Sequence, residues 1–337
     1  MDIRVPFDEL KGALRAAMLT LGFPAERAEM CARLFAETTR DGVYTHGLNR
    51  FPRFQASIRN GMLDVTAKAE KTGGVGAFER WKGNRAAGNL SAHTCMSRAV
   101  ELAKTHGIGC VALRDTNHWL RAGTYGWLAA DAGVIGMNWT NTMPNLVPWG
   151  ATQRAIGNNP IVIAVPRASG AHVVLDMALS QYSFGAIAGY VARGEQLPID
   201  GGYDVDGNIT RDPKLIDASQ AGLPIGYWKG SGLSVLLDLT AAIFSAGRAT
   251  HQMDGDPMKE SGQSQVFLAF DVKCFGDNES TERIANEVVD ALHAVKGRDG
   301  KRPRYPGEQT LKLREENMRL GVPVVEARWR ELLELAN

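Results

Sequence analysis

Cysteine is scarce in this sequence, which has only four in 337 residues. The four stand far apart, without a C-x-x-C pair, at Cys31, Cys95, Cys110 and Cys274. That spacing excludes both a disulfide framework and a cysteine-rich zinc site. We therefore expect four reduced thiols that take part in packing.

Neither sign of charge is in excess, since 38 lysines and arginines face 37 acidic residues and the formal net charge is +1. Balanced charge gives no electrostatic footprint for nucleic acid or an anionic membrane. The most apolar window, from Leu233 to Ala246, is too short to span a bilayer and contains Asp238. The first residues also lack the continuous apolar stretch of a signal peptide. We expect a cytoplasmic protein that binds neither nucleic acid nor membrane.

The common nucleotide-binding and catalytic motifs are missing as well. A Rossmann domain needs GxGxxG between a strand and a helix, but the nearest candidates carry Val235 and Glu79 in place of the third glycine. The chain has no P-loop, HExxH or GxSxG segment. No histidine, cysteine or acidic residues recur at metal-ligand spacing, so we expect no metal site. A nucleotide would have to bind by an uncommon route.

The composition that remains is that of a globular protein, with 44% hydrophobic and 22% charged residues. Helical periodicity predicts helices at both ends of the chain, at 7–21, 24–39, 280–295, 308–320 and 325–335. The middle alternates predicted strands at 110–113, 134–139, 161–165, 172–177 and 265–270 with helices at 90–104, 121–131 and 232–246. We predict an α/β (α+β) fold with a mixed sheet. Residues 1–72 and 280–337 would form a discontinuous helical domain, and residues 73–279 the α/β domain.

The first candidate site is an irregular segment that contains His46 and Arg50. A histidine between a hydroxyl residue and a glycine can project into a cleft, and the guanidinium of Arg50 suits a carboxylate. A proton donor beside an anion clamp is what the reduction of a 2-oxo acid needs. The alternative is that His46 caps the preceding helix and Arg50 is a solvated surface charge.

Two further candidates follow predicted strands. His118 comes just after the strand at 110–113, where residues of α/β proteins often line sites, but it could equally be a structural histidine beneath Trp119. The segment from 138 to 160 is rich in amides, hydroxyls and prolines, and includes Asn141 and Thr142. It could form a polar wall for a polyhydroxylated ligand or turns that hold a dimer contact.

Two segments could contact a nucleotide. Asp176 ends an apolar strand and could bond ribose hydroxyls, orient a histidine, or simply cap a helix. The glycine-rich segment at 226–232 opens an apolar helix and carries Trp228 and Lys229. Its backbone N–H groups and the lysine suit a pyrophosphate, although it could be an ordinary helix entry.

Six segments together resemble one family, the type-2 malate/L-lactate dehydrogenases. They are TRDGVYTHGLNRFPRF, GIGCVALRDTNHWLRAGTYGW, PWGATQRAIGNNP, LDMALSQYSFG, QLPIDGGYDVDGNIT and LPIGYWKGSGLSVLLDL. The resemblance runs from the first predicted helix to the last. It implies a non-Rossmann NAD(P)-binding fold, a homodimer, and reversible hydride transfer between NADH, with NADPH as the alternative cofactor, and a 2-oxo acid, here a 2-oxo sugar acid.

The resemblance also implies roles for individual residues. His46 corresponds to the proton donor and His118 to a second active-site histidine. As a hypothesis from the residues themselves, Arg50 would act beside them as a catalytic residue that holds the substrate carboxylate, and Asn141 and Thr142 would bind substrate. The implied cofactor-binding residues are His172, Val173, Val174, Leu175, Asp176, Met177, Ala178, Trp228, Lys229, Gly307, Glu308 and Gln309. The alternatives are a relative that acts on malate, lactate, ureidoglycolate or a cyclic imino acid, and a binding protein for a sugar acid that does not catalyse.

Overall fold

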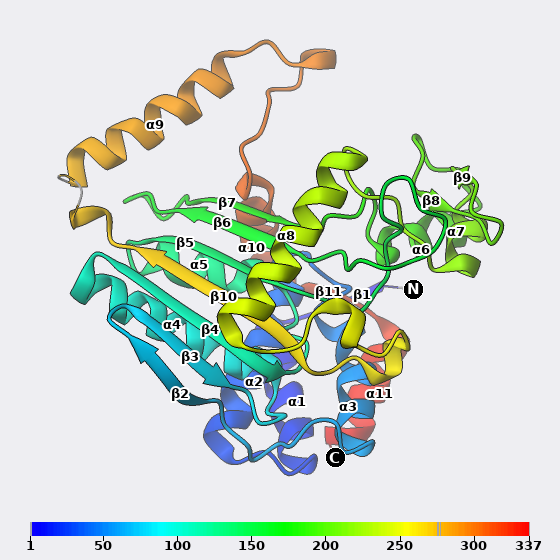
Figure 1. Cartoon of the computed structure of the whole chain (residues 1–337), viewed down its shortest axis with the longest axis horizontal. Coiled ribbons are helices and arrows are strands. Elements are labelled where there is room, and N and C mark those ends of the chain that lie inside the picture. Colours follow the sequence, from blue (N-terminus) through cyan, green and yellow to red (C-terminus); the bar gives the residue numbers. More distant parts are fainter. Residues whose placement is uncertain (1, 275, 277, 337) are drawn as a thin grey trace.

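The computed structural model describes residues 2–274, 276 and 278–336, and its centre is a seven-stranded mixed sheet (Figure 1). The strand order is β2-β3-β4-β10-β5-β6-β7, so β7 lies at one edge. The strands are β2 (Glu70–Val75), β3 (Phe78–Lys82), β4 (Ile108–Thr116), β5 (Ile135–Thr140), β6 (Ile161–Val165), β7 (Val173–Met177) and β10 (Gln263–Phe270). The pair β3 and β4 is parallel and the other neighbours are antiparallel. The predicted α/β class with a mixed sheet is confirmed.

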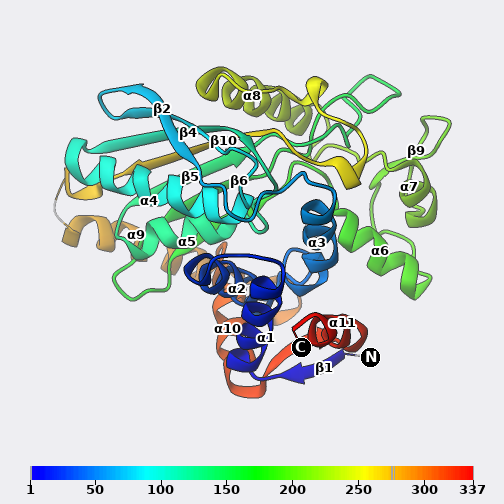
Figure 2. The same cartoon turned by 90° about the horizontal axis from the view of Figure 1, so that it is seen from below.

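Helices cover both faces of this sheet. Figure 2 shows α8 (Trp228–Ser245) on one face and α4 (Gly88–His106) with α5 (Gly123–Asp131) on the other. The side chains of β4 alternate accordingly, since Val111 and Leu113 belong to the core beneath α4 while Ala112 belongs to the core beneath α8. This period of two is what a strand buried on both faces requires.

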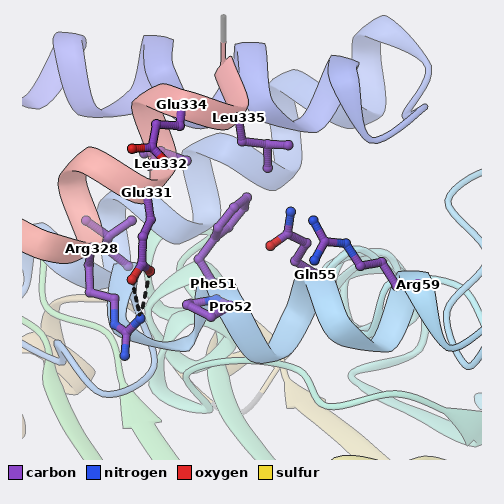
Figure 3. A pocket seen from close by; sticks show the side chains of 10 residues that line it. Phe51, Pro52, Gln55, Arg59, Arg328, Glu331, Leu332, Glu334 and Leu335 are labelled. Atoms are coloured by element: carbon purple, nitrogen blue, oxygen red, sulfur yellow. Dashed lines mark hydrogen bonds and ion pairs between the residues drawn. The ribbon is translucent and has the colours of Figure 1, made fainter.

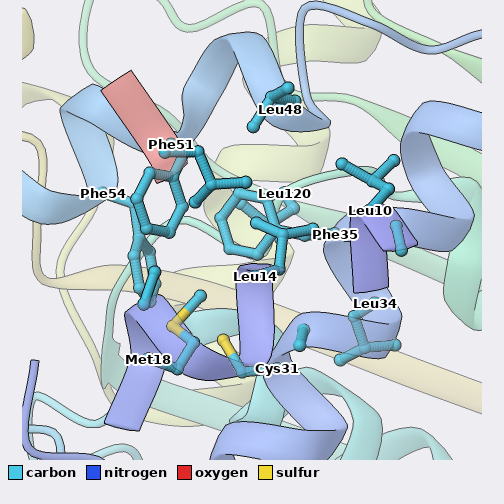
Figure 4. Packing of buried hydrophobic residues seen from close by; sticks show 14 of the residues in the cluster. Leu10, Leu14, Met18, Cys31, Leu34, Phe35, Leu48, Phe51, Phe54 and Leu120 are labelled. Atoms are coloured by element: carbon cyan, nitrogen blue, oxygen red, sulfur yellow. The ribbon is translucent and has the colours of Figure 1, made fainter. Parts of the chain in front are cut away.

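The two ends of the chain fold together. β1 (Asp2–Val5) pairs antiparallel with β11 (Val322–Val325), and the accompanying helices are α1 (Phe7–Thr20), α2 (Ala25–Arg40), α3 (Phe51–Arg59), α10 (Glu308–Leu320) and α11 (Glu326–Ala336). The apolar faces of α1, α2, α3 and α11 share one core, in which Leu10, Leu14 and Phe35 pack closely (Figure 4). The same core takes Leu120 from the segment after β4, so it reaches the α/β part.

One C-terminal helix lies outside this helical group. α9 (Asn278–Ala294) stands apart in Figure 1 and is held by polar contacts to the loop after β6. Arg167 donates to Asn286 Oδ1 at 2.6 Å, and the Ala168 N–H donates to Glu282 at the same distance. The proposed boundary at residue 280 stays a prediction, but these contacts tie α9 to the α/β part.

Several elements were not predicted. The segment around 41–54 was expected to be irregular, yet a 3₁₀ turn at Leu48–Arg50 leads into α3. The hairpin β2–β3 was not predicted, because every residue of β2 is exposed and its sequence shows no alternation of apolar and polar residues. The segment after β7 adds α6 (Phe184–Arg193), β8 (Gly202–Tyr203), β9 (Ile209–Thr210) and α7 (Pro213–Ser219). The predicted ends of β6 and α10 match the observed ones.

Cysteine placement corrects one expectation. All four thiols are free, and two are buried, but Cys274 is exposed and takes no part in a core. Within the described residues, no helix has the length and apolar character needed to cross a membrane.

Candidate active site

A cavity of about 610 Å³ opens where the helical group, the sheet and α6 meet. Its volume falls in the range of small-ligand sites, roughly 300–1,000 Å³. The polar and charged side chains that line it are Thr45, His46, Asn49, Arg50, Arg53, His118, Arg121, Thr140, Thr142, Asn145, Arg154, Asn158, Asp176, Ser183, Gln220 and Glu260. Both predicted histidines, Arg50, Thr142 and Asp176 therefore meet in one place, although they come from segments far apart in the sequence.

A second cavity, of about 350 Å³, lies between α3 and α11 and carries none of the predicted site residues. Figure 3 shows Phe51 in its wall and the ion pair between Arg328 and Glu331 beside it.

The end of α2 fixes the position of His46. The Leu48 N–H donates to Thr39 Oγ1 at 3.0 Å, which ties the following turn to the helix. A Cβ on Gly47 would lie only 2.3 Å from the same Oγ1, so only glycine lets the turn pass this close. Thr45 Oγ1 lies 3.0 Å from His46 Nδ1, within hydrogen-bonding distance. The ring therefore projects into the cavity from a rigid turn, as the first candidate predicted, and does not cap α2.

His118 is held by the segment that follows β4. The side-chain amide of the preceding Asn117 donates to three backbone carbonyls, and Ser261 Oγ donates to its carbonyl oxygen at 2.7 Å. The Leu120 N–H donates to His118 Nδ1 at 3.0 Å. Nδ1 is therefore an acceptor, and the neutral ring carries its proton on Nε2. Leu120 has φ of 66°, a rare conformation for a branched residue and the kind of strain found at functional sites.

The two histidine rings stack face to face, with centroids 5.7 Å apart and planes 19° apart. Burial and, to a smaller extent, the positive charge of Arg50 together lower the pKa of His46 to about 4. Burial also lowers the pKa of His118 well below its usual value, again helped by Arg50 and by His46 itself. Both rings are thus neutral at pH 7.

Arg50 has a partner that the sequence did not reveal. Its Nη2 lies 2.5 Å from Glu260 Oε2, and both side chains are largely buried. Gln263 Nε2 donates to the other carboxylate oxygen at 3.0 Å. Glu260 is 210 residues away from Arg50 in an irregular segment, so no local spacing could have pointed to it.

The two predicted substrate-binding residues of the 138–160 segment behave differently. Thr142 lines the cavity, whereas Asn141 is fully buried and does not. The Asn141 amide donates to Asp238 and to the Arg248 carbonyl, and its oxygen accepts from the Ser264 N–H. Every polar atom of this side chain is used inside the protein, which favours a structural role; that Asn141 binds substrate stays a prediction.

Only the end of the 172–178 segment reaches the cavity, through Asp176, Met177 and Ala178. The remaining four residues do not line the cavity: His172 precedes the edge strand β7, and Val173, Val174 and Leu175 lie in its first part. His172 is buried, with Nε2 3.0 Å from Asp131 and Nδ1 accepting from the Arg167 N–H. Its ring nitrogens are both engaged within the protein, and the cofactor contact predicted for His172 stays a prediction.

The other predicted cofactor segments lie beside the same strand. The Val174 N–H donates to the Pro306 carbonyl at 2.8 Å, which places Gly307 against β7. The Ile225 N–H donates to the Leu179 carbonyl at 2.8 Å, which places the start of α8 next to the strand's far end. The segments at 172–178, 228–229 and 307–309 therefore follow one edge of the sheet.

Their side chains are not equally free. Trp228 is 65% exposed and Lys229 lies close to its ring, so both are open to a ligand. Glu308 is buried and engaged by His293, Arg302 and Lys312, and Gln309 accepts a hydrogen bond from Arg304. Both side chains are thus engaged within the protein, and the cofactor contacts predicted for Glu308 and Gln309 stay predictions.

The free groups fit a dinucleotide. Asp176 offers a carboxylate that is 26% exposed, Trp228 an aromatic face, and Lys229 a cation for a pyrophosphate. A Cβ on Gly307 would lie 3.1 Å from the Val174 nitrogen, so the backbone there has the close approach that glycine permits. Residues 2–274, 276 and 278–336 hold no group of three or more potential metal ligands.

Comparison with known proteins supports the same family. The family model for malate/L-lactate dehydrogenase matches residues 5–333. The 2,3-diketo-L-gulonate reductase of Citrobacter koseri is 40% identical over 334 residues, covering 99% of this chain and all of the relative. That of Klebsiella pneumoniae is 41% identical with the same coverage.

Solved structures share the fold over the full length. The sulfolactate dehydrogenase of Methanocaldococcus jannaschii superposes with a TM-score of 0.92 at 26% identity, covering 99% of this chain and 97% of that one. The Δ1-piperideine-2-carboxylate reductase of Pseudomonas syringae has a TM-score of 0.90 at 28% identity, with 99% of both chains covered. The chain is therefore an oxidoreductase that belongs to the malate/L-lactate dehydrogenase family.

Proposed function

We propose that this protein reduces the 2-oxo group of 2,3-diketo-L-gulonate to give 3-dehydro-L-gulonate, reversibly and with NAD(P)H. Full-length relatives at 40% identity carry the name of this reductase. The observation that carries the proposal is a cavity in which two neutral histidines stand beside an arginine. Such a set can hold a carboxylate, polarise a carbonyl and supply a proton, which are the tasks of this reaction.

NADH is the proposed cofactor, with NADPH as the other candidate. Asp176, Met177 and Ala178 would hold it at the cavity, and Trp228, Lys229 and the backbone at Gly307 would hold it further along β7. Bound there, it would supply the hydride.

His118 is proposed to orient the substrate carbonyl. Because its Nδ1 accepts from the Leu120 N–H, its Nε2–H is the free donor. A neutral imidazole that donates from a fixed position can polarise a carbonyl without competing for the proton. Its depressed pKa keeps it in that form across the physiological range.

His46 is proposed to donate the proton that the C2 alkoxide takes up. The protonated ring is disfavoured by burial and by the charge of Arg50. A substrate carboxylate placed on Arg50 would offset that positive charge and raise the pKa of His46. Binding of the anionic substrate thereby prepares the acid.

Arg50 is proposed to bind the substrate carboxylate through its guanidinium fork. One edge of the fork already meets Glu260 at 2.5 Å, so the substrate either shares the guanidinium with Glu260 or displaces it. Thr142 lines the cavity and is the proposed contact for the sugar hydroxyls; its own hydroxyl donates to Asn158 Oδ1 at 3.0 Å.

A homodimer is proposed from an exposed apolar surface on α8. A helix that packs on the sheet with one side usually presents polar residues on the other, but here the outer side carries large apolar residues: Leu233, Val235, Leu236, Leu239 and Ile243. Contiguous apolar patches of this kind mark interaction sites. Sedimentation velocity tests the dimer, and Leu236→Glu should shift it toward monomer. The cytoplasmic location stays a prediction.

The initial rate of NADH oxidation tests the proposed reaction. The panel is 2,3-diketo-L-gulonate beside pyruvate, oxaloacetate and a cyclic imino acid. We expect kcat/KM for the diketo sugar acid to exceed the others at least tenfold, which corresponds to about 1.4 kcal/mol. Preference for another 2-oxo acid would keep the family and reject the substrate. Ligand binding without any NADH oxidation would favour the non-catalytic binding protein.

A further inference from the structure

Asp41, at the end of α2, is a buried carboxylate surrounded by three arginines. Arg121 Nη1 and Arg314 Nη2 each lie 2.7 Å from its Oδ2, and Arg40 Nη2 lies 2.9 Å from Oδ1. Asp41 is only 4% exposed. Burial opposes the charged carboxylate, but the Arg314 hydrogen bond and the charge of Arg121 outweigh it and lower the pKa of Asp41 to about 2. The ion pair therefore fixes the end of the Arg121 side chain.

The other edge of this arginine has no hydrogen-bond partner. Arg121 is 5% exposed, lines the cavity that holds His46 and His118, and leaves its Nε–H buried without an acceptor within the described residues. A buried donor left without an acceptor destabilises the protein. Groups of this kind in native proteins usually have a ligand or water as partner.

A carboxylate stands next to that unpaired donor. Asp176 Oδ2 lies 3.5 Å from Arg121 Nε, which makes an ion pair but not a hydrogen bond. Oδ2 instead accepts from the Gly123 N–H at 2.9 Å, at the start of α5. Because 26% of the Asp176 side chain is exposed, its carboxylate remains open to a ligand in the cavity.

We propose that Arg121 and Asp176 together recognise a hydroxyl group of the bound ligand, with Arg121 as a binding residue of the site. A hydroxyl can accept from the Arg121 Nε–H while it donates to the Asp176 carboxylate. Neither a carboxylate nor a ketone can do both. The proposal rests on the function proposed above, since both possible sources of the hydroxyl belong to that reaction.

The hydroxyl comes either from the ribose of the nicotinamide cofactor or from the chain of the sugar acid. Either contact is strong because the donor is charged and preorganised: Asp41 holds the guanidinium before the ligand arrives. This separates Arg121 from Arg53, which lines the same cavity but is exposed at its mouth.

Arg121→Lys tests the proposal. The lysine ammonium keeps a cation for Asp41, but a lysine side chain has no N–H group at the position of the arginine Nε. The matched control is Arg314→Lys. Arg314 Nη2 lies at the same 2.7 Å distance from the same Asp41 oxygen, but Arg314 does not line the cavity. Both variants are measured for thermal stability, for the Kd of NADH by fluorescence titration, and for kcat/KM with the diketo sugar acid and with pyruvate, which has no hydroxyl group.

We expect Arg121→Lys to lose about 10- to 100-fold in one of these quantities beyond the loss in the control. A loss in NADH affinity assigns the hydroxyl to the cofactor. A loss with the sugar acid, but not with pyruvate, assigns it to the substrate. Equal effects of the two lysine variants on every quantity would overturn the proposal.

Arginine Nε–H signals of the wild-type protein give a second readout, which is independent of folding in the variant. Addition of NADH or of L-gulonate should move one such signal that pyruvate leaves in place, since pyruvate can reach Arg50 but offers no hydroxyl. No such signal would contradict the proposal. Because L-gulonate and NADH are tested by binding, this result stands even where the wild-type protein turns over none of the 2-oxo acids and the proposed reaction fails.

Discussion

The pH dependence of the reduction examines the environment of His46. An isolated histidine has a pKa near 6.5, whereas burial and the charge of Arg50 lower the pKa of His46 to about 4. At pH 7 the protonated ring would then amount to about one molecule in a thousand. Protonating it at that pH requires about 4 kcal/mol, and the bound substrate must supply much of this.

The assay is the initial rate of NADH oxidation from pH 5 to 9 with chemistry as the slow step. Because kcat/KM reports the free enzyme, we expect it to fall about tenfold for each pH unit over the whole range, without a plateau below 6.5. The profile of kcat reports the complex and should bend at a higher pH, since a carboxylate on Arg50 offsets the charge that disfavours the imidazolium. A histidine resonance assigned with His46→Asn measures the same pKa without turnover.

Two results would refute this reasoning. One is a pKa of 6.5 or above for His46 in the free enzyme, which would mean that its burial does not exclude solvent as described. The other is a kcat/KM that is flat from pH 5 to 9, which would remove a titrating acid from the reaction altogether.

Four other changes have expected outcomes. His46→Asn should lower kcat by about 10²–10⁴ while the Kd of NADH stays unchanged, and a variant that keeps most of its kcat would exclude His46 as the acid. Glu260→Gln removes the negative charge that raises the pKa of His46, so the histidine resonance should titrate at lower pH than in the wild type; an upward shift would contradict the ion-pair geometry. Gly123→Ala places a Cβ 2.5 Å from Asp176 Oδ2 and should lower kcat/KM by about 10- to 100-fold. Gly12→Ala is the control, because a Cβ there meets nothing within 4 Å, and it should leave kcat/KM unchanged. Asp41→Asn should destabilise the protein by about 3 kcal/mol at pH 7. Because the pKa of Asp41 is lowered in the folded protein, its contribution to the free energy of unfolding is present above about pH 4 and is lost toward pH 2. The denaturant midpoints of variant and wild type should therefore converge over that interval.

Much of the site could be predicted from the sequence because its residues stand in recognisable segments. His46, Arg50, His118, Thr142 and Asp176 all line one cavity. Their roles stay proposals, but their convergence is a property of the fold. The sheet and most helices followed from periodicity, since apolar residues alternate along β4 and recur along α1.

The rest depends on contacts between distant segments. Glu260 meets Arg50 across 210 residues, and Arg314 meets Asp41 across 273, and neither pair leaves a local pattern. Asn141 looked free because amides in a loop often bind ligands, but the fold uses all of its hydrogen-bonding groups. The lowered pKa of His46 could not be predicted for the same reason, since the burial that lowers it arises only when the helical group packs against the sheet.

The most direct test of the central claim is the destination of the transferred hydride. NADH labelled with deuterium at the reactive C4 position is incubated with the enzyme and 2,3-diketo-L-gulonate, and the product is examined by NMR. We predict deuterium at C2 of 3-dehydro-L-gulonate, adjacent to the carboxylate that Arg50 would hold. Deuterium at C3, or product without deuterium, would contradict the proposed reaction at this site.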